Sequence, residues 1–441
     1  MSVRPHLLYT AWGFPPSRAG GVYRALATVN AFAARGWDVT VLTTPRELFI
    51  DSTGGDEALE GQIHPAVHVE RLPVTTPAFS ADIRAWSRWR ARYPELWIAA
   101  DWRRDLLRFP EPAYGRWRPA LQAAARRIHH EHPVSLALGT ANPNVDFLSG
   151  WTLWRESSVP FVMDYRDAWR LDVFSGRTLH SDRSRVARWE KRLQGAAEEI
   201  WFVNERIAAW HAERNRAASD RMRVVANGFD EYEVPLRVPI RPERSGRLRF
   251  GYVGTVSEHV PIENLIAGWR RARHTSDVLR GAELVIHGYV GHFGMSGSAV
   301  DVIARGLQDG VQFAGPVSKA TIGEVYSGFD VLVLALGTGR YVTSGKVYEY
   351  AATGIPVVSI HDPMNAASDV FRGAPAWDAA ASLSTDDIAA ALVSAGERAM
   401  RETDADRAAA QEWARQYERT RQLEPRIEAL RKSVCARGAL R

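Results

Sequence analysis

The sequence predicts an α/β protein with two doubly wound, Rossmann-like domains, and three observations support this fold class. A short apolar strand, a glycine-containing loop and a helix follow one another from residue 6, and the same order begins again near residue 248. Strand and helix patterns then alternate after each start, as in parallel sheets covered by helices. The 441 residues, of which 46% are hydrophobic, suffice for two such cores.

The first strand-helix-strand unit has the clearest pattern. It predicts a strand at His6–Thr10, a glycine-rich loop at Gly13–Gly21, a helix at Val22–Arg35 and a strand at Trp37–Thr43. Apolar residues recur at helical spacing through the helix, and Gly36 follows as its stop signal. The first sheet is therefore expected to start here.

The rest of residues 1–230 continues this first domain. Residues 81–130 are expected to form a helical insert dense in arginine and tryptophan, and Arg223–Asp230 the last strand and turn. The remaining expected elements are strands at Val67–Leu72, Ser135–Gly139, Pro160–Asp164 and Ile200–Val203, and helices near 144–157, 183–197 and 204–215.

A second domain is expected at 247–400, after a linker at 231–246 that is rich in proline and arginine. Residues 401–441 are expected to form terminal helices that could pack back on the first domain. Within the second domain we expect strands at Leu248–Val253, Glu283–His287, Val311–Ala314, Val331–Leu336, Pro356–Ile360 and near 376–378, and helices at Ile262–Arg273, Lys319–Ser327 and between Gly345 and Gly354.

Composition narrows the functional classes. A net charge of +5 suits anionic small molecules or an anionic membrane surface, and we expect no nucleic-acid partner. The single cysteine, Cys435, excludes an internal disulfide framework and a cysteine-based zinc site, and favours a cytoplasmic location. We recognise no signal peptide and no run of about 20 apolar residues that could span a bilayer. Attachment to the cytoplasmic face of a membrane stays open.

Residues 344–363 are the most informative segment. After Ser344 and Gly345, a short helix carries Lys346 and Glu349 on one face. A cation above the free N–H groups of a first helical turn suits a phosphate, and a carboxylate one turn later can accept hydrogen bonds from sugar hydroxyls. The alternative is an amphipathic helix with both charges solvated. The following strand is continuously apolar and hence buried, which favours a nucleotide-sugar site at the rim of the sheet.

Two segments of the first domain supply further candidates. Gly20 and Gly21 open a helix after a strand, where an anion can approach the backbone, although an ordinary loop would look the same. Arg166 and Asp167 follow a strand, and we interpret them as residues that contact a sugar or phosphate. The alternative is a local ion pair that fixes their loop.

Arginine and tryptophan interleave between residues 84 and 104. Such a surface could meet a membrane, stack on a sugar acceptor or bind single-stranded nucleic acid. We favour either inward tryptophans with outward arginines or a wall for the acceptor. The histidines show no zinc-binding spacing, so no metal site is expected, and His259 is the best candidate for a phosphate contact.

Together these residues resemble the retaining family 4 glycosyltransferases, which have the GT-B fold, over nearly the whole chain. The resemblance implies two domains facing across a cleft, a nucleoside diphosphate sugar held by the second domain, and no metal or cofactor. The matching segments are Gly13–Gly21, Asp164–Trp169, Asn227–Asp230, Phe250–Gly254, Gly315–Ser318 and Lys346–Val358.

The resemblance also implies roles for individual residues. Tyr341 stands where the family has the glutamate that touches the donor sugar, and Thr255 stands near a missing arginine that would bind the diphosphate. No lysine lies between 255 and 265, so Lys346, His259 and backbone N–H groups are expected to carry that role. The implied catalytic residues are Arg166, Asp167 and Lys346, and the implied donor-binding residues are Gly20, Gly21, Gly254, Thr255, His259, Val317, Tyr341, Ser344, Gly345, Lys346 and Glu349.

The expected function is transfer of a sugar from a nucleoside diphosphate sugar to an acceptor hydroxyl, with retention of configuration. The acceptor is a saccharide, a lipid-linked saccharide or a small natural product. One alternative keeps the fold but makes the protein a pseudo-glycosyltransferase or a sugar-nucleotide epimerase. The other is a non-catalytic protein that binds a nucleotide sugar or a glycan.

Overall fold

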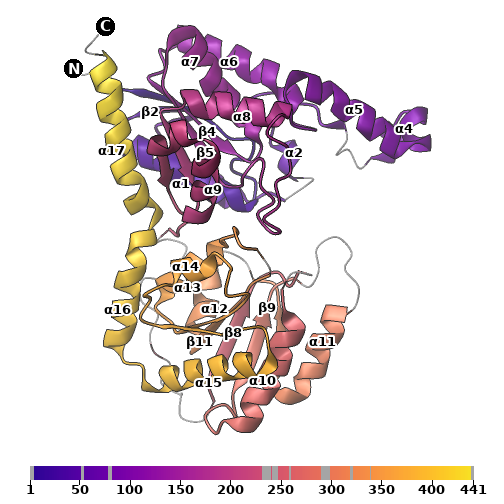
Figure 1. Cartoon of the computed structure of the whole chain (residues 1–441), viewed down its shortest axis with the longest axis vertical. Helices are drawn as coiled ribbons and strands as arrows, with labels where there is room; N and C mark the ends of the chain where they lie inside the picture. Colours follow the sequence, from indigo (N-terminus) through magenta and orange to yellow (C-terminus); the bar gives the residue numbers. More distant parts are fainter. Residues whose placement is uncertain are drawn as a thin grey trace. The chain divides into compact units, whose positions relative to one another are not determined.

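The computed structural model forms two compact units, which are considered separately below (Figure 1). The first contains the chain up to Asp172, Arg177–Ala226 and the C-terminal segment from Gln422, and the second contains Val173–Gly176 and Asn227–Arg421. Most of the expected linker at 231–246 lies outside the described residues. The structure describes residues 4–50, 54–77, 82–230, 240, 247–257, 260–289, 298–317, 321–337 and 339–438.

The first unit is built on a seven-stranded parallel sheet with the order β3-β2-β1-β4-β5-β6-β7. The order reverses between β1 and β4, so the loops after these two strands leave in opposite directions. The strands are β1 His6–Thr10, β2 Asp38–Thr43, β3 Val67–Arg71, β4 Leu136–Ala141, β5 Phe161–Tyr165, β6 Glu199–Phe202 and β7 Met222–Val224.

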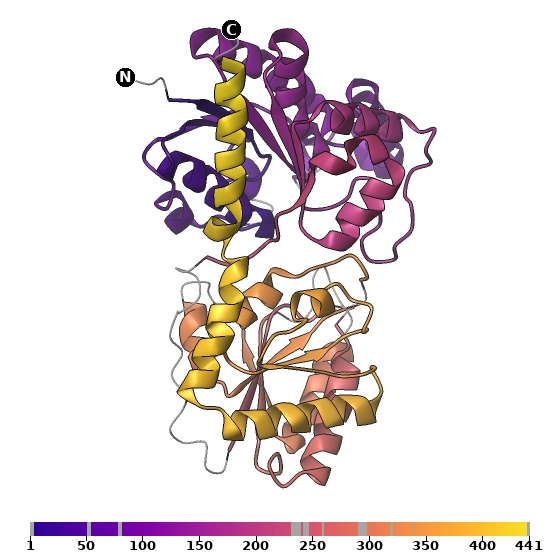
Figure 2. The same ribbon diagram turned by 60° about the vertical axis from the view of Figure 1, so that its left-hand side comes forward.

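Helices flank both faces of this sheet (Figure 2). Near the C-terminus, Leu423, Ile427 and Leu430 of α17 join the buried core of the first unit. The helices are α1 Gly20–Ala34, α2 Glu47–Ile50, α3 Glu57–Glu60, α4 Arg88–Arg92, α5 Pro94–Arg108, α6 Arg118–Glu131, α7 Leu148–Ser157, α8 Arg185–Ala196, α9 Glu205–Arg214 and α17 Arg419–Gly438, the last beginning in the second unit.

The second unit contains a six-stranded parallel sheet with the order β10-β9-β8-β11-β12-β13. Here the order reverses between β8 and β11. The strands are β8 Arg249–Val253, β9 Glu283–His287, β10 Val311–Gly315, β11 Val331–Ala335, β12 Val357–Ile360 and β13 Trp377–Ala379. The helices are α10 Ile262–Thr275, α11 Ser298–Gly306, α12 Ile322–Ser327, α13 Gly345–Thr353, α14 Ala367–Val370, α15 Thr385–Arg401 and α16 Asp404–Ala414.

Glycine ends α13 for two structural reasons. Gly354 has φ = +73°, which L side chains rarely adopt. A Cβ atom at this position would also lie 2.6 Å from the backbone oxygen of Arg407 in α16. Gly354 therefore permits both the turn into β12 and the close approach of α16.

The predicted fold class of two Rossmann-like α/β domains is confirmed. Helices α2, α3, α11 and α14 were not predicted, and the other differences lie at element ends. The first helix starts at Gly20 rather than Val22, and the helix expected near 144–157 begins as a 3₁₀ turn at Asn144–Phe147. The helix expected from Lys319 begins at Ile322. Over the described ranges, no helix combines the length and the apolar character that crossing a bilayer requires.

Candidate functional site

A cavity of about 290 Å³ lies at the carboxyl edge of the second sheet. Thr255 and Ser257, which follow β8, and Leu336 and Gly337, which follow β11, line it. These are the two strands between which the strand order reverses. Doubly wound sheets bind their ligands at this position, because the loops diverge there and leave a crevice. The cavity is therefore the candidate ligand site of the second unit.

The start of α13 forms one wall of this cavity. The Ser344 hydroxyl caps the helix by accepting a hydrogen bond from the Lys346 amide at 3.3 Å, and both residues line the cavity. The Lys346 side chain lies against the backbone at Gly254, because a Cβ atom there would come within 1.5 Å of its Nζ atom. An ammonium group thus adds to the positive end of the helix dipole, and together they favour an anion.

Glu349 lies one turn further along α13 and is buried, with 9% of its surface exposed. Its Oε2 atom accepts a hydrogen bond from the Tyr326 hydroxyl at 3.1 Å. The alternative of a helix with both charges solvated is therefore wrong for Glu349. Val347, Ala351 and Ala352 of the same helix are also buried.

Tyr350 attaches α13 to the end of β8. Its hydroxyl donates a hydrogen bond to the Val253 carbonyl oxygen at 3.2 Å and accepts one from the Val253 N–H group at 3.0 Å. Burial raises the pKa of the Tyr350 hydroxyl above its ordinary value, so it stays protonated as this donor. The contact fixes Gly254, the next residue, relative to Lys346.

Of the other predicted donor residues of the second unit that the structure describes, two lie at or next to the cavity and the rest do not line it. Gly345 is the first residue of α13, and Thr255 lines the cavity. The Tyr341 amide donates a hydrogen bond to the Val173 oxygen at 3.2 Å, and its neighbour Val342, rather than Tyr341, is among the described residues that line the cavity. Val317 lies two residues beyond β10 and does not line it. His259 and Ser318 lie outside the described residues.

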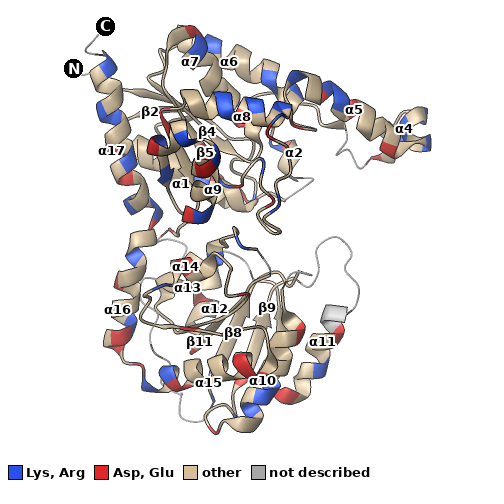
Figure 3. Ribbon diagram, viewed as in Figure 1, with Lys and Arg blue, Asp and Glu red and all other residues tan. Residues whose placement is uncertain are grey.

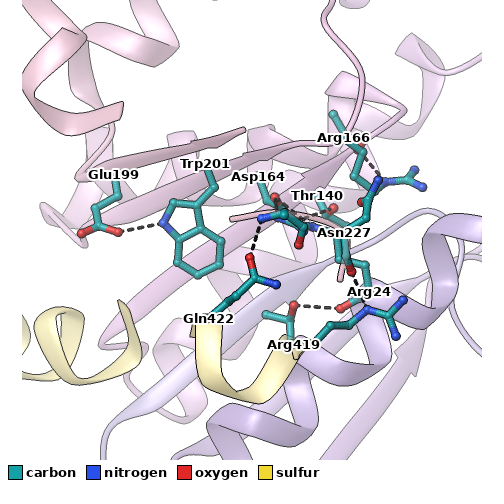
Figure 4. Close-up of polar contacts among 12 residues, drawn as sticks. Arg24, Thr140, Asp164, Arg166, Glu199, Trp201, Asn227, Arg419 and Gln422 are labelled. Carbon is teal, nitrogen blue, oxygen red and sulfur yellow. Dashed lines mark hydrogen bonds and ion pairs between the residues drawn. The ribbon is translucent and has the colours of Figure 1, made fainter. Parts of the chain in front are cut away.

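In the first unit, the carboxylate at the end of β5 pairs with α1. Asp164 is fully buried, and its two carboxylate oxygens accept hydrogen bonds from Arg24 at 2.6–3.2 Å (Figure 4). The Thr140 hydroxyl donates a further hydrogen bond to Asp164 at 3.1 Å. Asp164 thus pairs with a residue 140 positions away, and among the described residues no ion pair joins Arg166 to Asp167, so the alternative of a local ion pair is wrong.

Arg166 instead binds backbone oxygens. Its Nε atom donates to Ala141 at 2.7 Å and its Nη2 atom donates to Asn142 at 2.9 Å (Figure 4). A Cβ atom at Gly21 would lie 1.4 Å from Arg166 Nη1, so this pair of predicted residues is in contact. Gly20 and Asp167 are both exposed, and a Cβ atom at Gly20 would have nothing within 4 Å.

Two buried carboxyl groups near this edge of the first sheet were not predicted from the sequence. Asp146 accepts a hydrogen bond from the Trp12 amide, just after β1, at 2.7 Å. Glu111 accepts hydrogen bonds from the amides of Asn144 and Val145, each at 2.8 Å. Burial raises the pKa of Glu111 to about 7 and that of Asp146 well above its ordinary range. Glu111 comes from the helical insert, and no motif signals its role.

Three residues of the second unit were also not predicted from the sequence, for a different reason. Tyr252, Phe174 and Asn365 line the cavity, yet they belong to segments far apart in the chain. The alternation of β8 could have identified Tyr252 as a residue with a defined face, but nothing local marks Phe174 or Asn365. In the part of the chain that the structure describes, no three His, Cys, Asp or Glu side chains are grouped as metal ligands.

Comparison with solved structures shows the same fold in several proteins. The structure of HepE from Anabaena in complex with UDP has a TM-score of 0.63 and 14% identity, covering 98% of this chain and 100% of that one. A glycosyltransferase from Rickettsia africae has a TM-score of 0.60 and 12% identity over 98% and 99% of the two chains. Sucrose-phosphate synthase from Thermosynechococcus elongatus has a TM-score of 0.56 and 16% identity over 99% and 98%.

No curated protein sequence matches the chain significantly. One family model matches, however, and the matched region holds β8, α13 and all the residues that line the cavity except Phe174. The chain is thus similar, over residues 247–422, to the family of group 1 glycosyl transferases.

Proposed function

We propose that the protein transfers a sugar from a nucleoside diphosphate sugar to an acceptor hydroxyl, with retention of configuration and without a metal ion. The observation that carries this proposal is the ammonium group of Lys346 beside the capped start of α13, at the cavity where the second sheet reverses its strand order. The match of residues 247–422 to group 1 glycosyl transferases supports the same reaction class.

In this proposal the diphosphate binds to Lys346, to the first N–H groups of α13 and to the backbone at Gly254. Thr255 and Ser257 also line the cavity and offer hydroxyl groups. Glu349 accepts hydrogen bonds from the ribose hydroxyls, which would replace the hydrogen bond that it now accepts from Tyr326. Uracil is the first base to test, because solved structures of HepE contain UDP and UDP-glucose.

During the reaction the bond between the anomeric carbon and the diphosphate oxygen breaks, and the acceptor oxygen bonds to the same face of that carbon. The acceptor proton passes to the departing phosphate oxygen, so no strong protein base is needed. Lys346 and the N–H groups of α13 stabilise the negative charge that develops on the leaving diphosphate. We assign contacts with the sugars to Arg166, Asp167 and Tyr341.

A ligand screen followed by one substitution tests the donor site. Thermal unfolding with UDP, GDP, dTDP and their sugar conjugates should identify a stabilising ligand, since binding to the folded state raises its stability by mass action. Lys346→Met should then weaken binding of that ligand roughly 10- to 100-fold, because it removes a hydrogen bond to a charged group. Lys191→Met, at an exposed lysine of α8, is the matched control.

Product analysis by mass spectrometry separates the alternatives. Sugar transfer to an acceptor, or slow hydrolysis of the donor, supports the proposal. Conversion of the donor into an isomeric nucleotide sugar would instead identify an epimerase, and binding without any turnover would identify a binding protein. Unchanged affinity in Lys346→Met would show that the diphosphate binds elsewhere.

A further inference from the structure

Helices α4 and α5 of the first unit expose large apolar side chains. Leu107 is 77% exposed and Leu96 is 63% exposed, while Trp89, Tyr93 and Trp102 are 48%, 46% and 36% exposed. Figure 1 shows the two helices projecting from the rest of this unit. Isolated exposed apolar residues need no explanation, but five within 19 residues form a patch that calls for a partner. Residues 88–108 are referred to below as the α4–α5 arm.

The inner face of α5 is fixed by an ion-pair cluster. Asp101 and Asp105 are buried, and both bind the guanidinium group of Arg116, at 2.6 and 2.8 Å. Residues seven and eleven positions apart share a helical face, so Leu96 and Leu107 lie together on the face away from these carboxylates. The exposed leucines therefore lie on an outer face of α5 that also carries Arg103, seven residues after Leu96.

The tryptophans of the arm do not simply pack inward with the arginines outward, which was one of the two interpretations favoured from the sequence. Arg90 is buried, and its guanidinium carbon lies 4.0 Å from the ring centre of Trp86 and 4.7 Å from that of Trp97. This cation-π stack forms the structural centre of the arm. Trp89 and Trp102 are left with their rings partly in solvent.

The exposed charge of the arm is almost all positive (Figure 3). Both carboxylates of its core are used by Arg116, which leaves Glu95 as the exposed acidic residue of the arm. Within the described residues, none of its exposed arginines forms an ion pair with a carboxylate. These arginines are Arg88, Arg92, Arg103, Arg104 and Arg108.

We propose that the α4–α5 arm binds an anionic lipid surface. The exposed leucine, tryptophan and tyrosine side chains of the arm would enter the boundary between headgroups and acyl chains, as in helices that lie in a membrane interface. The long arginine side chains would reach the lipid phosphates beside them. Leucines favour lipid over single-stranded nucleic acid, because a base stacks on an aromatic ring and not on an aliphatic one.

Sedimentation of the full chain with lipid vesicles tests this proposal, independently of glycosyl transfer. The protein should bind vesicles of phosphatidylcholine mixed with phosphatidylglycerol, and should bind pure phosphatidylcholine much more weakly. Binding should fall with added salt, because screening weakens attraction between exposed charges. Arg103→Gln with Arg104→Gln should lower the partition coefficient roughly 25-fold, at about five-fold per arginine.

A second variant tests the apolar contribution. Leu96→Gln with Leu107→Gln should lower vesicle binding by at least about 10-fold through lost apolar burial. The matched controls are Arg188→Gln with Arg192→Gln on α8 and the exposed Leu307→Gln, and these should bind like the wild type. All substituted residues are exposed, so thermal unfolding should be unchanged.

Three outcomes would overturn the proposal. The first is equal binding to neutral and anionic vesicles, or none to either. The second is retention of vesicle binding in both arm variants. The third is that the arm variants abolish self-association or oligonucleotide binding while leaving vesicle binding intact, which would assign the surface to a second copy of the chain or to nucleic acid.

Discussion

The carboxyl edges of the two sheets both place a cation against a glycine, but the surroundings of the two cations differ. Each has a cation against a glycine backbone, Arg166 at Gly21 in the first unit and Lys346 at Gly254 in the second. Arg166 is held by two carbonyl oxygens and interacts electrostatically with the buried Asp146, whereas Lys346 lines a cavity at a helix N-terminus. The same topology thus gives an edge suited to an anion in the second unit only.

The largest expected effect is on the stability of the first unit. Asp164→Ala would leave Arg24 buried without its carboxylate partner, and loss of one member of a buried pair costs about 3–5 kcal/mol. The free energy of unfolding from urea denaturation measures this loss. Glu156→Ala, which breaks the exposed pair with Arg126, is the control and should cost at most about 1 kcal/mol. Equal effects of the two substitutions would contradict the role assigned to the buried pair.

The acidic character of the first edge can be tested by pH. Because burial raises the folded-state pKa of Glu111 from 4.5 to about 7, its favourable contribution to stability is complete below pH 4.5 and is lost as pH rises through 7. The stability advantage of the wild type over Glu111→Gln should therefore shrink across this range, by about 3 kcal/mol at most. Glu95→Gln, at an exposed carboxylate, should show no such trend. A constant difference for Glu111→Gln would mean that its carboxyl group titrates normally.

The two glycines give the most direct contrast, although a smaller effect. Gly254→Ala places a methyl group 1.5 Å from Nζ of Lys346, so the flexible lysine must move, and nucleotide affinity should fall about 10-fold with little change in stability. Gly21→Ala displaces Arg166 from two carbonyl oxygens and should cost about 1–2 kcal/mol of stability without changing nucleotide affinity. If both substitutions lowered nucleotide affinity equally, the proposed difference between the edges would be wrong.

The sequence predicts the fold well because strand and helix periodicities are local. It also predicts the helix that starts after Ser344 and carries Lys346 and Glu349, since this start needs no knowledge of distant segments, and Ser344 and Lys346 both line the cavity. The end of this helix at Gly354 could also be predicted, because a glycine stop signal is local, and the positive φ angle of Gly354 agrees with that prediction.

Tertiary partners could not be predicted in this way. Asp164 pairs with Arg24 because folding brings the end of β5 to a side chain of α1, and no spacing in the sequence encodes that pair. Glu111 is likewise far in sequence from Asn144, whose amide donates a hydrogen bond to it. The burial that raises the pKa of Glu111 is a result of folding and is not visible in the sequence. The inward or outward direction of the tryptophans in the insert depends on Arg90, which only packing shows to be buried.

The central claim, that Lys346 binds the diphosphate of a donor in the second unit, is best tested by calorimetry with two ligands. The nucleoside diphosphate selected by the ligand screen should bind the wild type much more tightly than its parent nucleoside does. In Lys346→Met this preference should fall roughly 10- to 100-fold, with the affinity for the nucleoside unchanged. A variant that keeps the full preference for the diphosphate would contradict the account.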